Sequence, residues 1–470
     1  MAITGDFAKA RLDRSAVPTA GAVELSISVR VPPNSYLAGL LLGTFFSALC
    51  FYLRFDIAGF ILFIFSWVLL PYFALNDLVA FDGRRLNRTG LLPRIWTRLS
   101  GARARLKVSD IEQVDTQAIR ALRRAGNVYY RYRTNLRGKG MLITITSGGE
   151  DFRRMIAEVL TRLSDDVLDS RSIDLRDHLS DPKETLMKAE FEHIPSADVL
   201  RQTNSWRVRG SRTVRPPGEN DETRSNYLRS LGNELRVHGY LLQAIEAFRR
   251  ALVIRPNDPR LLFECARCIQ SLAAADRDPR LERKAIATMR LAERRANDDP
   301  ALLERIGEAY FQAGKLRRAD HVFRRVLGRE GLGFRAARGL AEIALREGKI
   351  AHVVHHFGTA HQLAKSASPR RWTNSEVEYF SRLNDDPNYL EMEVSRVNML
   401  DSIARTRRVS LRIALSGLPA ILIGVIGDDS LIADIGWAVT TVCLLLWTGL
   451  FAASRMFSPR IPYELLNEED

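Results

Sequence analysis

Four long apolar stretches, arranged as two pairs, limit most strongly what this chain can fold into. Residues 36–53 and 57–75 are separated by only three residues, and each stretch is close to the roughly 20 residues that a helix needs to span a bilayer. Residues 409–453 hold a second pair, divided by an acidic turn at Asp428 and Asp429. The sequence therefore predicts two transmembrane helical hairpins, at 36–75 and 409–453.

Basic residues beside both pairs predict where the rest of the chain lies. The flanking arginines are Arg84, Arg85, Arg88, Arg94, Arg98, Arg405, Arg407, Arg408, Arg412, Arg455 and Arg460. Because loops rich in arginine stay in the cytoplasm, both termini and the whole middle of the chain are expected there. The arginine-rich flanks and compact hairpins favour a multi-pass protein of the bacterial inner (plasma) membrane.

The N-terminal segment and the cysteines agree with this placement. Residues 1–35 contain no short apolar core followed by a small-residue cleavage site, so a cytoplasmic segment is predicted there and not a removable signal. Cys50 and Cys443 fall inside the apolar stretches, where no disulfide framework is expected. A reducing compartment is the better interpretation.

Gly39 and Gly43 form a GxxxG pair in the first apolar stretch. Small residues at this spacing let two helices approach closely. The partner helix belongs either to a second copy, which would give a homo-oligomer, or to the same chain. The sequence leaves both interpretations open.

A different pattern recurs with a period near 34 residues in the middle of the chain. Residues 231–252, LGNELRVHGYLLQAIEAFRRAL, place small residues at regular positions of an amphipathic helical pattern. In the copies that start at Ser225, Pro300 and Phe334, the eighth place holds Gly232, Gly307 and Ala341, and the fifteenth holds Gly239, Gly314 and Gly348. The twentieth place holds Ala244, Ala319 and Val353.

This pattern resembles the tetratricopeptide repeat, and the resemblance covers residues 225–365 as four copies. The second copy is degenerate and stretched around AAADRDPRLE, which predicts a longer turn there. The resemblance implies pairs of helices that cross closely at the small eighth and twentieth places. Gly239, Gly314 and Gly348 are expected to end the first helix of their copies.

Stacked pairs of this kind form an open solenoid, so the resemblance implies a groove that takes a peptide from another protein and no enclosed catalytic cavity. We name the candidate partner-binding residues of the first helices the first-helix face: Asn226, Arg229, Asn233, Arg236, Arg260, Phe263, Arg267 and Arg305. Arginine and asparagine donate hydrogen bonds to carboxylates, so an acidic peptide is the expected ligand.

Two acidic ligands suit this face. Arg229, Asn233 and Arg305 resemble part of the carboxylate clamp of chaperone-binding repeat proteins, although Glu264 and Ala301 depart from that pattern. The chain's own C-terminal tail, residues 454–470, ends in YELLNEED and is expected on the same side of the membrane. Docking of this tail, in cis or in trans, is a second hypothesis.

Residues 77–165 alternate apolar and polar side chains in short runs and end in the helical segment FRRMIAEVLTRL. A small antiparallel β domain closed by one helix is predicted, and its order is similar to bacterial pleckstrin-homology-like domains. Residues 76–150 hold 15 basic and 6 acidic side chains, so most of the net charge of +14 of the whole chain lies in this segment. This concentration of positive charge favours anionic membrane lipids as a partner. The candidate headgroup contacts are Arg131, Arg133, Arg137 and Lys139, with solvation of a strand edge as the alternative.

Three further segments connect these parts. Residues 166–223 are polar and irregular, which predicts a linker with at most short helices. Residues 366–408 are typical of two helices that return the chain to the bilayer and cap the last repeat. Residues 454–470 are predicted to be an acidic tail.

Residues with catalytic or metal-binding chemistry form no convincing set. Cys265 and Cys268 form a CxxC on a repeat helix, where core packing is the expected role. His352, His355 and His356 have a spacing that can hold a metal, but no nearby Cys, Asp or Glu completes the site, so a hydrated or partner-facing cluster is expected. We expect no enzyme activity, cofactor or metal, and no nucleic-acid partner because the basic residues follow the membrane flanks.

These patterns predict an α-helical tetratricopeptide-type solenoid, a small antiparallel β domain and four transmembrane helices in two hairpins. The expected function is that of a membrane-anchored adaptor or scaffold that binds a protein or peptide on the cytoplasmic face. The alternative is an accessory subunit of a membrane enzyme or transporter complex in envelope assembly, whose transmembrane helices bind the partner.

Overall fold

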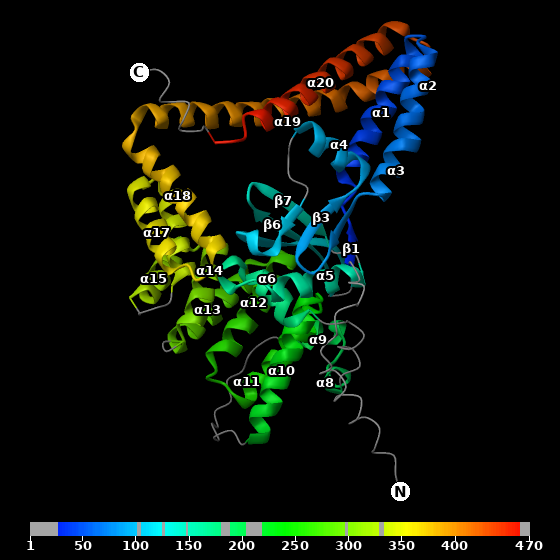
Figure 1. Cartoon of the computed structure of the whole chain (residues 1–470). Coiled ribbons are helices and arrows are strands. Elements are labelled where there is room, and N and C mark those ends of the chain that lie inside the picture. The colour runs from blue at the N-terminus through cyan, green and yellow to red at the C-terminus, as the bar shows by residue number, and fades with distance from the viewer. Residues whose placement is uncertain are drawn as a thin grey trace, which may run out of the picture. The chain divides into compact units, whose positions relative to one another are not determined.

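The computed structural model of this chain is mostly helical with two antiparallel sheets (Figure 1). It divides into two compact units: one takes in residues up to Tyr36, Pro71–Pro256 and Cys268–Ala285, and the other the remaining residues. The structure describes residues 27–100, 105–124, 127–146, 149–179, 189–203, 219–296, 299–328 and 333–460.

Four helical segments in the described residues are long and apolar enough to cross a membrane, which confirms both predicted pairs. They are α1 (Asn34–Tyr52), the continuous run of α2 (Asp56–Ile64), η3 (Phe65–Leu69) and α3 (Leu70–Leu75), α19 (Pro387–Ile426) and α20 (Ser430–Met456). The π-helical turn η3 lies just before Pro71, which cannot donate to the carbonyl four residues earlier. Helix α19 begins well before the predicted span, since residues 388–416 contain no proline or glycine, and it continues through Pro419.

The GxxxG pair packs within its own hairpin. A Cβ on Gly43 would lie 1.9 Å from Ser66 Oγ, and one on Gly39 would lie 3.4 Å from Leu70 Cδ1. Nearby, the Ser47 hydroxyl donates to the Gly59 carbonyl over 2.8 Å. Of the two interpretations of this pair, the structure shows packing inside one chain.

The two hairpins contact each other near their turns. The Trp437 ring of α20 stacks on Tyr52 and lies 5.1 Å from Phe45, both in α1. The Tyr52 hydroxyl donates to Asp434 Oδ1 over 2.7 Å. Tyr52 and Asp434 each lie beside the turn of their hairpin, so the two turns lie at the same end of the helices.

In the residues that the structure describes, seven strands form the two sheets, both antiparallel. One has the order β1 (Ile27–Arg30), β2 (Leu78–Phe81), β3 (Arg85–Thr89) and β4 (Arg105–Lys107), and the other the order β5 (Gln113–Arg124), β6 (Asn127–Gly138) and β7 (Met141–Thr146). The segment 1–35 thus contains a strand that the sequence analysis did not predict. Strand β1 precedes the first hairpin and pairs with β2 after it, with Ile27 opposite Phe81. Both ends of the hairpin therefore lie side by side.

The β domain extends beyond its predicted end at residue 165. Helix α5 (Glu150–Thr161) closes the core as predicted, but Val167, Leu168, Ile173 and Leu175 are buried in the same core. Val167 ends η5 (Asp165–Val167), Leu168 follows it, and Ile173 and Leu175 belong to α6 (Ser170–His178). Asp169 caps α6 through the Ser172 amide. The first part of the predicted linker is therefore domain core. The short helices α8 (Ala189–Glu192) and α9 (Ala197–Thr203) follow.

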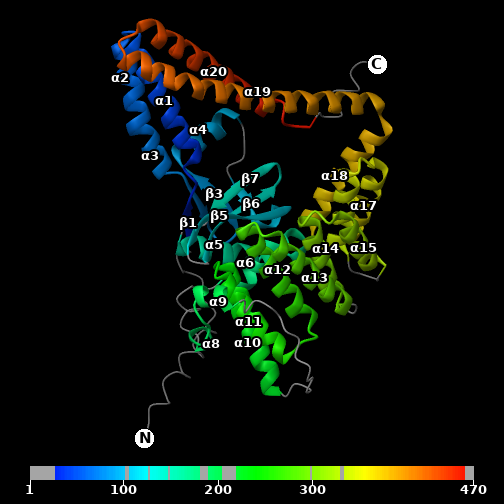
Figure 2. The ribbon, with the colours of Figure 1, turned by 180° about the vertical axis from the view of Figure 1, so that it is seen from behind.

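The helices from α10 to α17 follow in sequence as four consecutive pairs. They are α10 (Glu219–Val237) with α11 (Leu241–Ile254), α12 (Pro259–Asp276) with α13 (Pro279–Arg295), α14 (Pro300–Gln312) with α15 (Leu316–Leu327), and α16 (Phe334–Arg346) with α17 (Ile350–Leu363). Both helices of the first pair, α10 and α11, and of the third, α14 and α15, are labelled in Figure 2. Gly239, Gly314 and Gly348 have positive φ angles after the first helix of three pairs. The residue after each glycine donates its amide to the carbonyl five residues earlier, so the predicted glycine caps are confirmed.

The second pair differs from its prediction. Only Arg277 and Asp278 separate α12 from α13, and the inserted residues lengthen the helices and not the turn. Ala273, Ala274 and Ala275 favour continuation of α12 because alanine has the highest helix propensity. Arg277, with φ 53°, takes the left-handed position that glycine fills in the other pairs.

Small residues at the eighth place let the paired helices touch. A Cβ on Gly232 would lie 2.9 Å from the Phe248 ring of α11, and one on Gly307 would lie 2.4 Å from the Phe323 ring of α15. The last pair ends against α18 (Ala367–Asp385), whose Phe380 stacks on Phe357 of α17. Two helices thus follow the pairs, as predicted, and the first of them covers the last pair.

Candidate functional site

The first-helix face on α10 changes from exposed to buried along the helix. Asn226 is exposed and Arg229 is half-buried. Asn233 and Arg236, one and two turns later, are 1% and 8% exposed. The start of α10 is therefore open to a partner, whereas the end of its predicted face is covered by the chain itself.

The covering elements are α6 and β6 of the β domain. Arg236 Nη2 lies 3.2 Å from Asp174 Oδ1 of α6, and both side chains are less than a tenth exposed. The Tyr132 hydroxyl of β6 donates to the Val237 carbonyl at the end of α10. Burial raises the pKa of Tyr132, so its phenol stays a donor at neutral pH. Arg236, which was predicted to bind an acidic peptide from a partner, is thus paired with Asp174 of the same chain.

A cationic and aromatic cluster joins three other predicted residues. The Phe263 ring of α12 is fully buried, and the guanidinium carbons of Arg267 and Arg305 lie 5.7 and 5.5 Å from its centroid. Arg260, more exposed, donates from Nη2 to Asp299 Oδ2 over 2.7 Å, beside the start of α14. The structure therefore brings Phe263, Arg267 and Arg305 together and places Arg260 in an ion pair.

Helices α14 and α16, which are the first helices of the third and fourth pairs, carry a mixed surface of acidic, basic and apolar side chains. Glu304, Glu308 and Phe311 of α14 are half-buried. The Arg346 guanidinium of α16 lies 4.3 Å from the Phe311 ring centroid, and the neighbouring Leu345 is 46% exposed. Carboxylates, a guanidinium and apolar side chains on one surface suit a peptide that carries both charged and apolar residues.

Three of the four lipid candidates, the arginines, share one sheet face. Arg131, Arg133 and Arg137 alternate along β6 with buried residues and are exposed, and Lys139 follows in the turn, where its Nζ lies 2.9 Å from Asp110 Oδ2. Ile119 lies opposite Arg131, and Leu142 lies opposite Arg137. Both apolar side chains are exposed, at 47% and 55%. The sequence analysis missed Ile119 and Leu142, because an alternation of apolar and polar side chains predicts a strand but does not show which face of the sheet stays uncovered.

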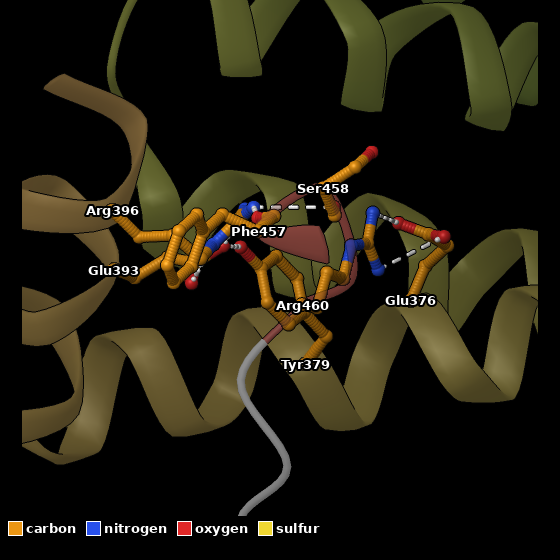
Figure 3. A network of polar contacts seen from close by, with 7 residues as sticks. All are labelled: Glu376, Tyr379, Glu393, Arg396, Phe457, Ser458 and Arg460. Atoms are coloured by element: carbon orange, nitrogen blue, oxygen red, sulfur yellow. Dashed lines mark hydrogen bonds and ion pairs between the residues drawn. The ribbon is translucent and has the colours of Figure 1, made fainter. Parts of the chain in front are cut away.

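A network of charged and aromatic side chains holds the residues that follow α20 (Figure 3). The Arg460 guanidinium donates to both Glu376 carboxylate oxygens and lies 3.9 Å from the Tyr379 ring centroid. The Tyr379 hydroxyl donates to Glu393 over 2.6 Å, and Arg396 donates to the same carboxylate.

Arg396 also reaches the end of α20, the last membrane-length helix. Its Nη1 donates to the carbonyl of Phe457, the C-cap residue, over 2.9 Å and to the carbonyl of Ser458 over 3.1 Å. The Phe457 carbonyl is among those that a helix end leaves without intrahelical partners. The network therefore fastens the end of α20 to α18 and α19. The acidic end of the tail, and with it the docking hypothesis, lies outside the described residues.

The three histidines were expected to be hydrated or to face a partner, but one of them, His356, is buried. His352 and His355 are exposed, but His356 is 8% exposed and faces Arg324 and Asp320 of α15. Burial, reinforced by His355, Arg324 and His352, lowers the pKa of His356 to about 4. In the part of the chain that the structure describes, no group of three His, Cys, Asp or Glu side chains is placed to hold a metal ion.

Acidification is expected to destabilise the α16–α17 pair through His356. The unfolded imidazole protonates near pH 6.5 and the folded one near pH 4, so the unfolded state binds more protons between these values. Stability should fall as the pH drops from about 6.5 to about 4. The thermal midpoint of the purified protein, measured across this range, checks the effect.

A matched pair of variants isolates His356 from other titrating groups. His356→Gln should flatten this part of the pH profile, whereas His355→Gln, at an exposed neighbour, should leave it nearly unchanged. An unaltered profile in the His356 variant would contradict the assignment.

The cysteines of the CxxC are both buried thiols. Burial raises the pKa of Cys265 to about 12, so this thiol stays protonated, and the Cys268 Sγ lies 3.5 Å from the Leu241 carbonyl oxygen. Both observations agree with core packing.

Comparison with known proteins adds no assignment. No protein-family model matches the chain, and no curated protein matches it.

Proposed function

We propose that this chain is a membrane-anchored adaptor or scaffold, built on tetratricopeptide-type repeats, that binds a protein or peptide partner. The recurrence of one helix-pair geometry carries the proposal. Gly232 against Phe248 and Gly307 against Phe323 form the same close contact, and glycine caps of one conformation end three first helices. Repeated pairs of this kind expose long helix surfaces, which suit partner binding better than catalysis.

The partner surface that we propose excludes the residues buried by the chain itself. Asn226 and Arg229 of α10 remain accessible in one unit, and α14 and α16 expose their mixed surface in the other unit. Arg236 is held by Asp174 and donates to Asn233 Oδ1, and Tyr132 holds the Val237 carbonyl beside them, so these contacts position α10. A peptide with acidic and apolar residues fits the accessible part.

We further propose that the protein lies in the bacterial inner membrane, with the β domain and repeats in the cytoplasm. The arginine-rich flanks of both hairpins support this orientation. The exposed arginines of β6, with Ile119 and Leu142 exposed on the neighbouring strands β5 and β7, support contact with anionic lipids through a pleckstrin-homology-like domain.

Site-specific photo-crosslinking in native membranes tests the adaptor function. A photoreactive residue at Asn226 or Leu345 should capture a partner protein. The same residue at Leu422 or Val442, which are 62% and 64% exposed on the second hairpin, should capture lipid or nothing. Protein crosslinks from Leu422 and Val442 alone would contradict the adaptor and favour an accessory subunit that binds its partner through the membrane helices.

A further inference from the structure

A buried carboxylate fixes the base of the first hairpin. Asp77 follows the last turn of the hairpin, and its side chain is fully buried. The Tyr36 hydroxyl of α1 donates to it over 2.8 Å, and Arg88 of β3 donates from Nε and Nη2 over 3.0 and 2.6 Å. Both legs of the hairpin and strand β3 therefore meet where the chain leaves the apolar stretch.

Helix α4 (Leu91–Ser100) begins at the same place. Strands β2 and β3 return the chain to the hairpin, since Thr89 lies opposite Leu78. A Cβ on the next residue, Gly90, would lie 3.3 Å from the Asn76 carbonyl oxygen. The start of α4 therefore lies beside the end of a membrane-length helix.

The start of α4 exposes apolar side chains beside a positive charge. Leu91 and Ile95 are 43% and 50% exposed and lie one turn apart, which places them on the same side of the helix. Arg94, between them in sequence, is exposed as well. Transfer of a leucine or isoleucine side chain out of water is favourable, so this side of α4 favours an apolar cover.

We propose that α4 lies in the interface of the phospholipid bilayer, with Leu91 and Ile95 among the acyl chains and Arg94 at the lipid phosphates. Because α4 starts beside the end of the hairpin, where that hairpin would leave the bilayer, the nearest apolar phase is the bilayer itself. This position favours lipid over a protein as the cover of Leu91 and Ile95. The inference rests on the proposed membrane span of the first hairpin. It adds a lipid-binding surface that is separate from the arginines of β6.

Accessibility of a spin label in vesicles tests this placement. The full chain, with Cys50→Ser and Cys443→Ser, is labelled at Ile95→Cys and reconstituted in phosphatidylethanolamine and phosphatidylglycerol. Compared with a label at Asp151→Cys, on the exposed first turn of α5, the Ile95 label should collide more often with oxygen and less often with a water-soluble nickel complex. A label at Ile61→Cys, which is 63% exposed on α2, serves as the membrane reference.

The outcomes separate this inference from the membrane span. If the Ile61 label is protected from nickel and the Ile95 label is not, the hairpin spans and the placement of α4 is wrong. A label at Ile95 that neither reagent reaches indicates a protein cover and also overturns it. Nickel access at Ile61 would overturn the span and the inference together.

Discussion

Asp174→Asn is expected to destabilise the packing of α10 on α6 by about 3–5 kcal/mol, the usual cost of removing one partner from a buried ion pair. Asp174 and Arg236 are 5% and 9% exposed at their side chains, so water cannot replace the lost counter-ion freely. The substitution keeps the shape of the side chain and removes its charge. Hydrogen exchange of the α6 and α10 amides, in the full chain in nanodiscs, measures the loss.

The same substitution in an exposed pair is the control. Asp320 and Arg324 form an i,i+4 pair on α15 with side chains 32% and 61% exposed. Asp320→Asn should cost only about 0.3–0.5 kcal/mol, because solvent screens an exposed pair. Equal effects of the two variants would show that the Asp174 carboxylate contributes no more than a surface charge.

The Asp174 contact also illustrates what the sequence alone did not reveal. The repeat pattern predicts that Arg236 lies on the groove-facing side of its helix. It predicts nothing about which other segments pack against that side. The counter-ion of Arg236 comes from a polar segment that has no periodic apolar pattern and was predicted to be a linker. A face predicted from one repeat therefore could not show that another domain of the same chain covers it.

Strand β1 was missed for a related reason. Its pairing partner β2 lies on the far side of the first hairpin, so no local turn signal connects Ile27 with Phe81. Four residues of alternating burial are too short to be distinguished from an irregular segment. The hairpin joins the two strands, so their pairing is a long-range contact that no local pattern reveals.

Features set by local chemistry were predictable. The apolar stretches specify membrane-length helices by length alone, and both pairs are present. A positive φ angle is easily reached only by a residue without a Cβ. Three helices therefore end at glycines, and each of these glycines has a positive φ angle: Gly239, Gly314 and Gly348. The second copy was less predictable, since alanine propensity and the left-handed Arg277 together replaced the usual glycine cap.

Gly307→Ala is expected to destabilise the α14–α15–α16 packing, although alanine favours a helix over glycine by about 0.5–1 kcal/mol. The Phe323 ring of α15 lies between two glycines: a Cβ on Gly307 would lie 2.4 Å from Cε1, and one on Gly339 of α16 would lie 2.4 Å from Cε2. The ring, 2% exposed, cannot move away from one helix without approaching the other. Overpacking of about 1–3 kcal/mol should therefore exceed the gain in helix propensity.

Two further variants determine whether the cost comes from the Phe323 ring. Gly358→Ala, on α17, adds a Cβ that meets no atom within 4 Å, so this control should be neutral or stabilising. Phe323→Leu removes ring atoms, so the double variant Gly307→Ala with Phe323→Leu should lose less stability than the sum of the single variants. Thermal unfolding of the three variants and the double variant in nanodiscs measures these differences. Strict additivity would mean that Gly307 does not act through Phe323, and the close helix crossing would lose its physical basis.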